Sequence, residues 1–302
     1  MADVERIPYD EFSLFHENAE EFGLPYGGPP VVRREGVEVE PGRSLSALVW
    51  GNSDPELVFL HGGAQNAHTW DTVALALDRP LIAIDLPGHG HSDGPKQSSI
   101  APRSNAEDVA TVIRAAAPNA RGVIGMSLGG LTAIALGGIA PELVRALVLV
   151  DVTPGVTGEK GKVIADFING PESFPSFDEI LARTIEYNPT RTESSLRRGI
   201  LHNAEQRPDG SWVWRYLRFR PAEGAGDPFT EFSTLWEVVD GLRMPVMLVR
   251  GMRSQSVVDD EDEAELLRRC PSAGVERVVE AGHSVQGDAP LELARLVDSF
   301  VP

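Results

Sequence analysis

Residues 121–130 read Arg-Gly-Val-Ile-Gly-Met-Ser-Leu-Gly-Gly, and this stretch decides the fold. A short apolar run leads into Gly125-x-Ser127-x-Gly129, and small and apolar residues with helical spacing continue to Ile139. The pattern predicts a strand, a very tight turn and a helix, with Ser127 at the tip of the turn. Glycine is required at 125 and 129 because side chains there would collide where the strand and the helix fold back on each other.

This turn exposes the Ser127 hydroxyl at the N-terminal end of a helix. The helix N-terminus, and the Leu128 N–H with it, is directed at whatever Ser127 attacks. The pattern therefore indicates a nucleophilic serine. The alternative interpretation is a glycine-rich turn that carries an idle serine.

Apolar strands alternate with helices on both sides of this turn. We expect strands at 57–60, 81–85, 121–124, 146–151, 245–250 and 275–279, and helices at 71–77, 104–117, 128–139, 261–269 and 289–300. Such alternation is typical of an α/β protein with a mostly parallel sheet and helices on both faces. Ligands on these sheets bind at the carboxyl ends of the strands, where His61, Asp85, Ser127 and Asp151 are expected.

The alternation stops between residues 154 and 240. This segment holds helical patterns at 161–169, 177–187 and 194–204 but no clear buried strand, so it is interpreted as a mainly helical lid inserted over the strand ends. The expected organisation is an N-terminal extension at 1–30 with a helix over 12–22, a core at 31–153 and 241–302, and a lid (cap) insertion at 154–240. The core opens with an antiparallel hairpin formed by 31–34 and 44–51.

The bulk composition narrows the classes of function. A net charge of −18 over 302 residues argues against binding to nucleic acid or an anionic membrane. The single cysteine, Cys270, excludes an intrachain disulfide and a zinc–cysteine cluster, and it is expected to be a packed, inert thiol at a helix end. Without a signal-like first segment or an apolar run of about 20 residues, a soluble, cytoplasmic protein is expected.

Five motifs occur together in a fixed order, and together they resemble the α/β-hydrolase fold family from about residue 44 to 302. They are His61-Gly62-Gly63, Asp85-x-Pro-Gly-His-Gly-x-Ser92, Gly125-x-Ser127-x-Gly129, Asp151 after its strand, and Gly282-His283 before the last helix. The stretch from His61 to Trp70 and the lid also resemble actinobacterial, mycobacterial-type carboxylesterases. The resemblance implies the α/β-hydrolase fold and a serine hydrolase.

A serine nucleophile needs a base with a pKa near neutral, which imidazole provides. Among seven histidines, His283 is the expected base because it follows the last strand and the sheet order brings its loop beside Ser127. Its alternative role is to cap the final helix. In the family the histidine at position 61 is usually structural, while His68 is a candidate for lining the pocket.

The acid of the triad departs from the commonest family pattern. Most members carry it after the strand that is 245–250 here, but this chain has Gln255 at that position. Some members place the acid one strand earlier, where Asp151 stands, 24 residues beyond Ser127. Asp151 is the favoured acid, with Asp259 and Asp260 as alternatives. The competing role for Asp151 is to cap the turn that follows it.

The oxyanion formed by acyl attack needs hydrogen-bond donors. The expected donors are the backbone N–H groups of Gly63 and Leu128, although Gly62 and Gly63 also fit a turn that is merely tight. Candidate substrate-binding residues are Gly62, His68, Trp212 and Trp214. The aromatic run Trp212, Trp214, Tyr216 and Phe219 fits an acyl pocket and a packed lid equally well.

The leading hypothesis is a serine hydrolase that cleaves carboxylic esters through an acyl-enzyme on Ser127. Thioesterase, lactonase, carbon–carbon bond hydrolase and perhydrolase activities would use the same triad. An alternative of another class is a non-catalytic small-molecule binding protein with the same fold, supported by Gln255 alone. No metal and no cofactor are expected, the partner is a small-molecule ester substrate, and the oligomeric state is left open.

Overall fold

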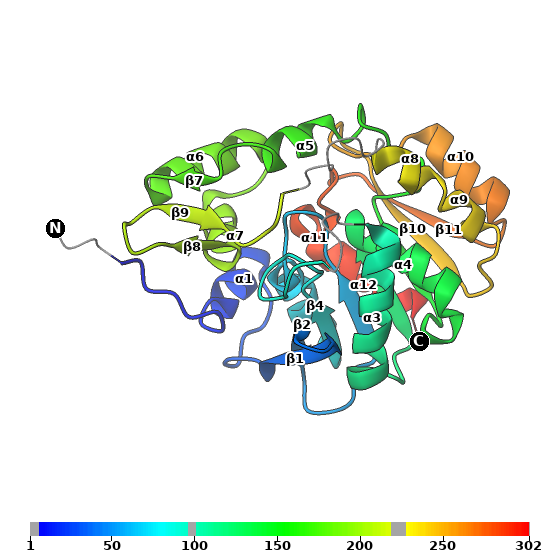
Figure 1. Cartoon of the computed structure of the whole chain (residues 1–302), viewed down its shortest axis with the longest axis horizontal. Coiled ribbons are helices and arrows are strands. Elements are labelled where there is room, and N and C mark those ends of the chain that lie inside the picture. Colours follow the sequence, from blue (N-terminus) through cyan, green and yellow to red (C-terminus); the bar gives the residue numbers. More distant parts are fainter. Residues whose placement is uncertain (1–5, 96–100, 219–227, 302) are drawn as a thin grey trace.

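The computed structural model describes residues 6–95, 101–218 and 228–301, although the side chains of residues 228–230 are not described. An eight-stranded sheet forms the centre, in the order β1-β2-β4-β3-β5-β6-β10-β11 (Figure 1). Its strands are β1 (Val32–Glu40), β2 (Arg43–Trp50), β3 (Leu57–Leu60), β4 (Leu81–Ile84), β5 (Gly122–Met126), β6 (Leu147–Val150), β10 (Val246–Gly251) and β11 (Gly274–Val278).

Strands β4, β3, β5, β6, β10 and β11 run parallel, whereas β1 and β2 form an antiparallel hairpin, and β2 joins β4 antiparallel. This arrangement confirms the predicted hairpin and the mostly parallel sheet. The first strand is longer than predicted, because a β-bulge near Glu38 lets the pairing continue to Glu40.

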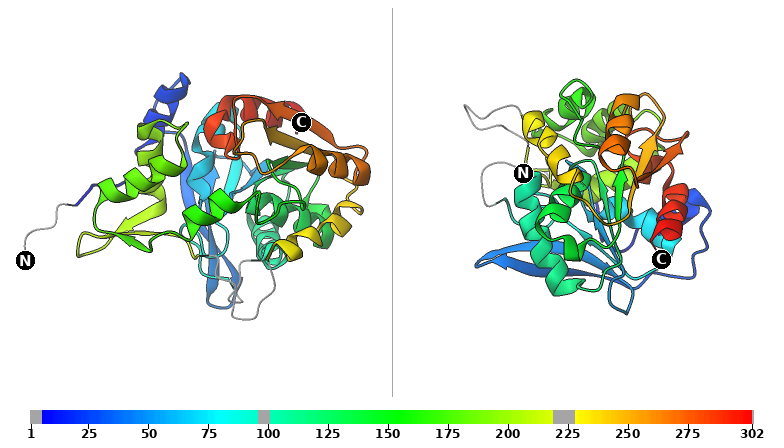
Figure 2. Two further views of the ribbon diagram at one scale, coloured as in Figure 1. Left: turned by 90° about the horizontal axis from the view of Figure 1, so that it is seen from above. Right: turned by 90° about the vertical axis from the view of Figure 1, so that its right-hand side faces the viewer.

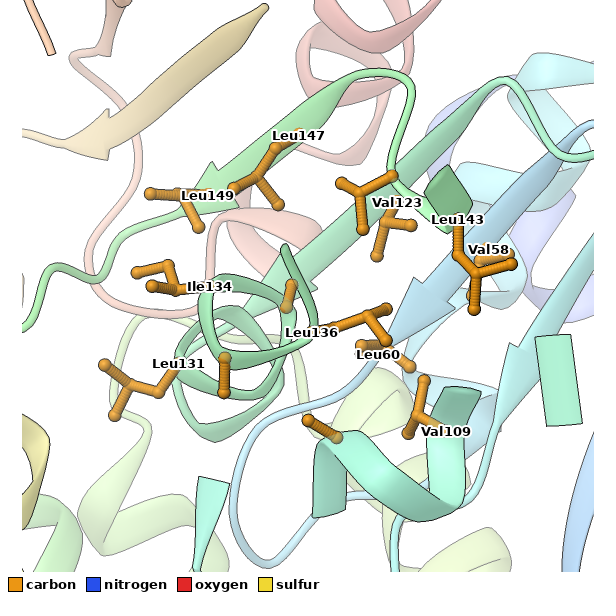
Figure 3. Close-up of a cluster of buried hydrophobic side chains, with 14 of the residues drawn as sticks. Val58, Leu60, Val109, Val123, Leu131, Ile134, Leu136, Leu143, Leu147 and Leu149 are labelled. Carbon is orange, nitrogen blue, oxygen red and sulfur yellow. The ribbon is translucent and has the colours of Figure 1, made fainter. Parts of the chain in front are cut away.

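Residues along each strand alternate between two hydrophobic layers, because successive side chains point to opposite faces. One layer packs helices α3 (Pro102–Ala116) and α4 (Leu128–Ile139) against strand residues such as Val58, Leu60 and Val123 (Figure 3). The other layer packs α1 (Phe15–Phe22), α2 (Asp71–Leu77) and α12 (Pro290–Phe300) against residues such as Phe59 and Ile124. Both faces of the sheet are therefore covered.

The helices around the last two strands also lie close to their predicted positions. Helix α10 (Asp260–Arg269) ends at Cys270, which is a buried free thiol, as the sequence predicts. The short helix α11 (Val285–Asp288) forms between the predicted strand at 275–279 and the predicted helix at 289–300, because four residues give too short a pattern to detect. Two short 3₁₀ helices, η1 (Ala67–Trp70) and η2 (Pro141–Leu143), complete the core.

Residues 154–240 connect β6 to β10, and none of the strands described within them joins the eight-stranded sheet. They contain α5 (Lys162–Ile168), α6 (Phe177–Tyr187), α7 (Glu193–Asn203), α8 (Pro228–Ser233) and α9 (Trp236–Val239). They also contain a three-stranded sheet of β7 (Ser173–Phe174), β9 (Trp212–Trp214) and β8 (Ala204–Gln206). The expectation that this segment lacks a buried strand was wrong, because β7 and β9 include the buried Phe174 and Trp212.

The segment from β7 to β9 lies beside the core (Figure 2). Its buried apolar side chains form a hydrophobic cluster of their own. Its members are Phe174, Ile180, Ile200, Leu201, Ala204 and Trp212. Within the described residues, no helix is long and apolar enough to cross a membrane.

Candidate active site

Ser127 occupies the turn between β5 and α4, with φ 51° and ψ −119°. This positive φ is rare for a residue with a side chain and costs conformational energy. The turn is close enough to require its glycines: a Cβ on Gly125 would lie 2.4 Å from the Gly129 carbonyl oxygen, and one on Gly129 would lie 2.2 Å from that of Leu60. The predicted strand, turn and helix are confirmed.

Asp151 follows β6 directly, is fully buried and has a positive φ of 47°. Its Oδ2 lies 2.9 Å from His283 Nδ1. The loop after β10 supplies three further hydrogen bonds to the carboxylate: Gly251 N–H (2.9 Å) and the Ser256 hydroxyl (2.6 Å) donate to Oδ1, and Val257 N–H (3.1 Å) donates to Oδ2. These three donors fix the position of the carboxylate beside the His283 ring.

Sequence reasoning missed the role of this loop. The loop after β10 lacks the acid that is expected there from the common family pattern. It instead donates hydrogen bonds to the carboxylate of Asp151, which follows the neighbouring strand β6. The signal would have been Ser256, but a serine in a loop is too common to single out. Gln255 lies on the wall of the cavity that Ser127 and His283 share, and does not contact Asp151.

The two alternative acids are engaged elsewhere. Asp259 caps α10, accepting a hydrogen bond from Asp262 N–H (2.9 Å), and pairs with Lys160 at 2.7 Å. Asp260 pairs with Arg250 at 2.7 Å. The structure therefore brings Asp151 to the imidazole and leaves both alternatives in ion pairs.

Ser127 and His283 line the same two cavities. In the described part of the chain, no hydrogen bond within 3.5 Å joins the Ser127 hydroxyl to the His283 ring. Hydrogen bonds between a nucleophile and its base often shorten only when substrate is bound.

The backbone N–H groups after β3 differ in whether they already donate a hydrogen bond, and this shows which of them is free to bind an oxyanion. Gly62 N–H donates to Gln65 Oε1 (3.1 Å), and Ala64 N–H donates to His89 Nε2 (3.1 Å). Gly63 N–H, between them, and Leu128 N–H, at the start of α4, donate to no acceptor among the described residues. Both are thus available for a developing negative charge.

Two buried neutral histidines shape this loop. Burial lowers the pKa of His89 to about 3 and that of His61 to about 4. The His89 Nδ1–H donates to the Pro87 carbonyl (3.0 Å), and this leaves Nε2 free to accept from Ala64. His61 likewise donates from Nδ1 to Gly62 O (2.7 Å) and accepts from Leu86 N–H (2.9 Å). The structural role expected of His61 fits this geometry.

Asp85 and Ser92 hold the loop after β4 in place. Asp85 accepts from Ala67 N–H (2.7 Å) and from Arg34 Nη1 (2.8 Å). The Ser92 hydroxyl donates to the Asp85 carbonyl (2.5 Å) and accepts from Ser46 N–H (2.8 Å).

The two cavities at Ser127 differ in character. The more polar one, about 360 Å³, which we call the polar cavity, is lined by Gln65, Lys160, Asn188, Arg191, Gln255 and Ser284, together with Gly62 and Gly63. It also has apolar walls, formed by Met126, Val163, Ile164, Phe167 and Ile168. The apolar cavity, about 310 Å³, is lined by Leu131, Val152, Val156, Ile164, Ile168 and Leu217, with Gly63 and Leu128 at its base. Helix α5 contributes Ile164 and Ile168 to both.

Of the predicted substrate-binding residues, Gly62 lies in the polar cavity, and the others lie away from Ser127. His68 and Trp214 line a third cavity of about 190 Å³ that borders the polar one. Trp212 is buried in the cluster of the small sheet, where its ring packs edge-on against Phe177 at 5.1 Å. Tyr216 stacks with Trp214 and His89, and Phe219 lies outside the described residues.

His68 is part of a buried ionic network. Its Nδ1 lies 2.9 Å from Asp71 Oδ2, and its Nε2 lies 3.3 Å from Glu11 Oε2, which is bound in turn by Arg34. A carboxylate oxygen faces each ring nitrogen of His68, and an ionised carboxylate only accepts hydrogen bonds, so both ring nitrogens must carry a proton. Burial opposes this charge, but Asp71 and Glu11 outweigh it and raise the pKa of His68 to about 9. The network ties the N-terminal extension to η1 and α2.

We expect His68→Gln to reduce the free energy of unfolding by about 3 kcal/mol near pH 6, because it breaks a buried ion pair. The pKa of His68 is higher in the folded chain than its ordinary value of 6.5, so this contribution is fully present below pH 6.5. It is lost as the pH rises through about 9. Denaturant unfolding at pH 6, 8 and 10 should therefore show the difference in unfolding free energy between wild type and variant falling from about 3 kcal/mol at pH 6 to near zero at pH 10. The exposed His16→Gln is the matched control, and a gap independent of pH would contradict the charged assignment.

His68, Asp71 and His202 form one group among the described residues whose ligand atoms, all within 4.8 Å of one another, suit a metal ion by residue type. The two imidazoles, however, stack at 3.9 Å with an angle of 13° between their planes. A ring nitrogen's lone pair lies in the ring plane, so one ion cannot lie in both planes without a ring rotating. The arrangement fits a hydrogen-bonded cluster better than a metal centre.

Comparison with known proteins accords with this geometry. The alpha/beta hydrolase family matches residues 57–296. The chain is 46% identical to the esterase Rv0045c of Mycobacterium tuberculosis, over 98% of this chain and 97% of that protein. A crystal structure of that esterase has a TM-score of 0.85 and covers 98% of this chain and 99% of its own.

A second structure of the same esterase, which concerns its inhibition by transition metals, also has a TM-score of 0.85. The pimeloyl-[acyl-carrier protein] methyl ester esterase of Sodalis glossinidius is 30% identical over 68% of this chain and 79% of that protein. The resemblance to mycobacterial esterases is thus confirmed, and the chain belongs to the alpha/beta hydrolase family.

Proposed function

We propose that this ester hydrolase works through an acyl-enzyme on Ser127, with His283 as base and Asp151 as acid. The hydrogen bond between His283 Nδ1 and Asp151 Oδ2, at 2.9 Å, carries the proposal. It orients a buried imidazole whose other nitrogen is free to serve the nucleophile. The 46% identity to an esterase over nearly the whole chain supports the reaction class.

In the proposed mechanism, the Ser127 oxygen attacks the ester carbonyl carbon while His283 Nε2 takes the hydroxyl proton. The N–H groups of Gly63 and Leu128 bind the resulting oxyanion, and each such donor typically contributes about 3 kcal/mol to the transition state. Collapse of the intermediate breaks the bond to the alkoxide, which receives the proton from His283. Water then attacks the acyl-enzyme while His283 takes one of its protons. The bond between the acyl carbon and the Ser127 oxygen breaks, His283 returns the proton to that oxygen, and the acid is released. Asp151 stabilises the imidazolium in both halves without taking its proton.

We also propose that residues 154–240 act as a lid. Helix α5 lines both cavities at Ser127, so this segment closes the space in which the ester would lie. Excluding water there strengthens the electrostatic interactions of the oxyanion donors. The proposed division is a core at 31–153 and 241–302, preceded by an N-terminal extension at 1–30.

A substrate panel tests the reaction type. We expect nitrophenyl esters with acyl chains of two to eight carbons to be hydrolysed with a clear optimum in chain length, because the apolar cavity has a limited volume. A thioester and a lactone of matched chain length are the comparison substrates. A higher kcat/KM for the thioester or the lactone would transfer the assignment to that class, and no turnover of any member would favour a binding protein.

The expected cytoplasmic location remains a proposal, to be tested by fractionation of the producing cells. We also propose that the protein does not bind nucleic acid, and the net charge of −18 supports this.

A further inference from the structure

Arg191 lies in the loop between α6 and α7 and lines the polar cavity that also contains Ser127 and His283. Its Nη2 donates to the Ser195 hydroxyl, and its backbone N–H donates to Asn188 O (3.2 Å). Among the described residues, no carboxylate oxygen lies within 4.0 Å of its guanidinium. Within the described parts of the chain, the bond to Ser195 is the one hydrogen bond that its side chain donates, so most of its five N–H donors have no acceptor there.

The other described lysine and arginine side chains that line these cavities, or the bordering cavity of about 190 Å³, are paired with carboxylates. Lys160 pairs with Asp259 and Asp262, each at 2.7 Å. Arg198, on α7, pairs with Glu21 and with Glu17. Arg191 therefore differs from Lys160 and Arg198, because they pair with carboxylates and it has no carboxylate within ion-pair distance among the described residues.

Two acids act on Arg191 from a distance, but both have other partners. Asp288 accepts a hydrogen bond from Gly282 N–H (2.9 Å), and Glu21 accepts from Arg198 and from the Thr192 hydroxyl. Burial lowers the pKa of Arg191, and the charges of Asp288 and Glu21 oppose that effect. The guanidinium stays charged, because its ordinary pKa is far above neutral.

The local packing keeps the guanidinium in this place. A Cβ added at Gly287 would lie 2.0 Å from Arg191 Nη1, so the side chain rests directly on the backbone of α11. Gly287 is four residues beyond His283 in the chain. The cation is thus held next to the loop that carries the proposed base.

Partly burying a charge without a partner is unfavourable, and such a group normally neutralises itself through an ion pair. The fork of a guanidinium matches the two oxygens of a carboxylate. The two cavities meet at Ser127 and His283. One half of an ester bound there would therefore face Arg191 in the more polar cavity, and the other half would face the nearly all-apolar walls of the second cavity.

We propose that Arg191 binds a carboxylate of the substrate, so that the enzyme acts on esters with a carboxylate on one half and an apolar chain on the other. This inference rests on the proposed function, because it places the scissile bond at Ser127. Arg191 contributes to substrate binding and takes no part in the proton transfers.

Two matched substrate pairs test the proposal. In the first pair, the mono-4-nitrophenyl ester of glutaric acid is compared with 4-nitrophenyl valerate, so the carboxylate lies on the acyl half. The pair 3-carboxyphenyl butyrate and phenyl butyrate places it on the alcohol half. After correction for intrinsic reactivity, we expect the wild type to favour the carboxylated member of one pair by about 10-fold or more in kcat/KM. The pair that shows the preference identifies the half that enters the polar cavity.

Arg191→Met should lower kcat/KM for the preferred carboxylated ester by about 30-fold, mainly through KM, and change the neutral ester by less than about 3-fold. Arg191→Lys should retain part of the preference. Arg197→Met, an exposed arginine on α7, is the matched control and should change neither member. The wild-type preference should also fall with added salt, a readout that needs no variant.

Equal kcat/KM for both members of both pairs in the wild type would overturn the proposal. The proposal would also be overturned if Arg191→Met lowered kcat/KM equally for the neutral and the carboxylated ester, because that result would mark Arg191 as a structural residue. Neutral esters distinguish a failure of the carboxylate proposal from a failure of the proposed function. If they are hydrolysed and Ser127→Ala stops this, the proposed function stands whatever the carboxylate pairs show.

Discussion

Ser127→Ala is expected to lower kcat for nitrophenyl ester hydrolysis by about 10⁶-fold, to the level left by the oxyanion donors and binding. The reason is that the replaced hydroxyl is the group that forms the covalent bond. KM should change little, because a methyl group fits wherever a serine side chain does. Initial rates at saturating and limiting ester concentrations measure both quantities.

The matched control is Ser284→Ala, which removes a hydroxyl from the same polar cavity beside His283. It should keep activity within about 10-fold of wild type, because no step is assigned to it. A Ser127→Ala enzyme with more than about 1% of wild-type kcat would contradict the assignment of the nucleophile.

Asp151→Asn is expected to lower kcat by about 10⁴-fold. An amide cannot stabilise the imidazolium, and it directs the His283 ring towards the wrong tautomer. The donors from Gly251, Ser256 and Val257 all face this carboxylate, so the amide NH₂ would also meet donors. Thermal unfolding of the variant separates loss of catalysis from loss of fold.

Asp259→Asn and Asp260→Asn are the controls, since each removes a carboxylate that follows β10, where most members of the family carry the acid. Both should leave kcat within a few-fold of wild type, because their carboxylates pair with Lys160 and Arg250. A loss at either position equal to that at Asp151 would refute the proposed acid.

The sequence predicts most of the sheet and its helices. Strand β3 and helices α2, α4 and α6 match their predicted bounds, because buried parallel strands are continuous apolar runs and the glycines around Ser127 tolerate few other folds. The position of Asp151 beside His283 agrees with the inference from Gln255. That inference worked by elimination, since an acid was missing at the common place.

Other features had no sequence signal. Strands β7, β8 and β9 have two or three residues each, too few to show a period, and they form only because they bury Phe174 and Trp212 against each other. Arg191 is unremarkable as a residue type, since arginine supplies most of the positive charge of the chain. What sets it apart is the lack of a nearby acid, which depends on the tertiary structure.

The most direct test of a covalent serine mechanism is the mass of the intact protein after reaction with a fluorophosphonate. The serine oxygen displaces fluoride and keeps the phosphonyl group, so the adduct is stable. The account predicts one adduct per chain, mapped to the peptide that contains Ser127, absent in Ser127→Ala and formed much more slowly in Asp151→Asn. An unlabelled wild-type protein that hydrolyses esters, or an adduct on another residue, would contradict it.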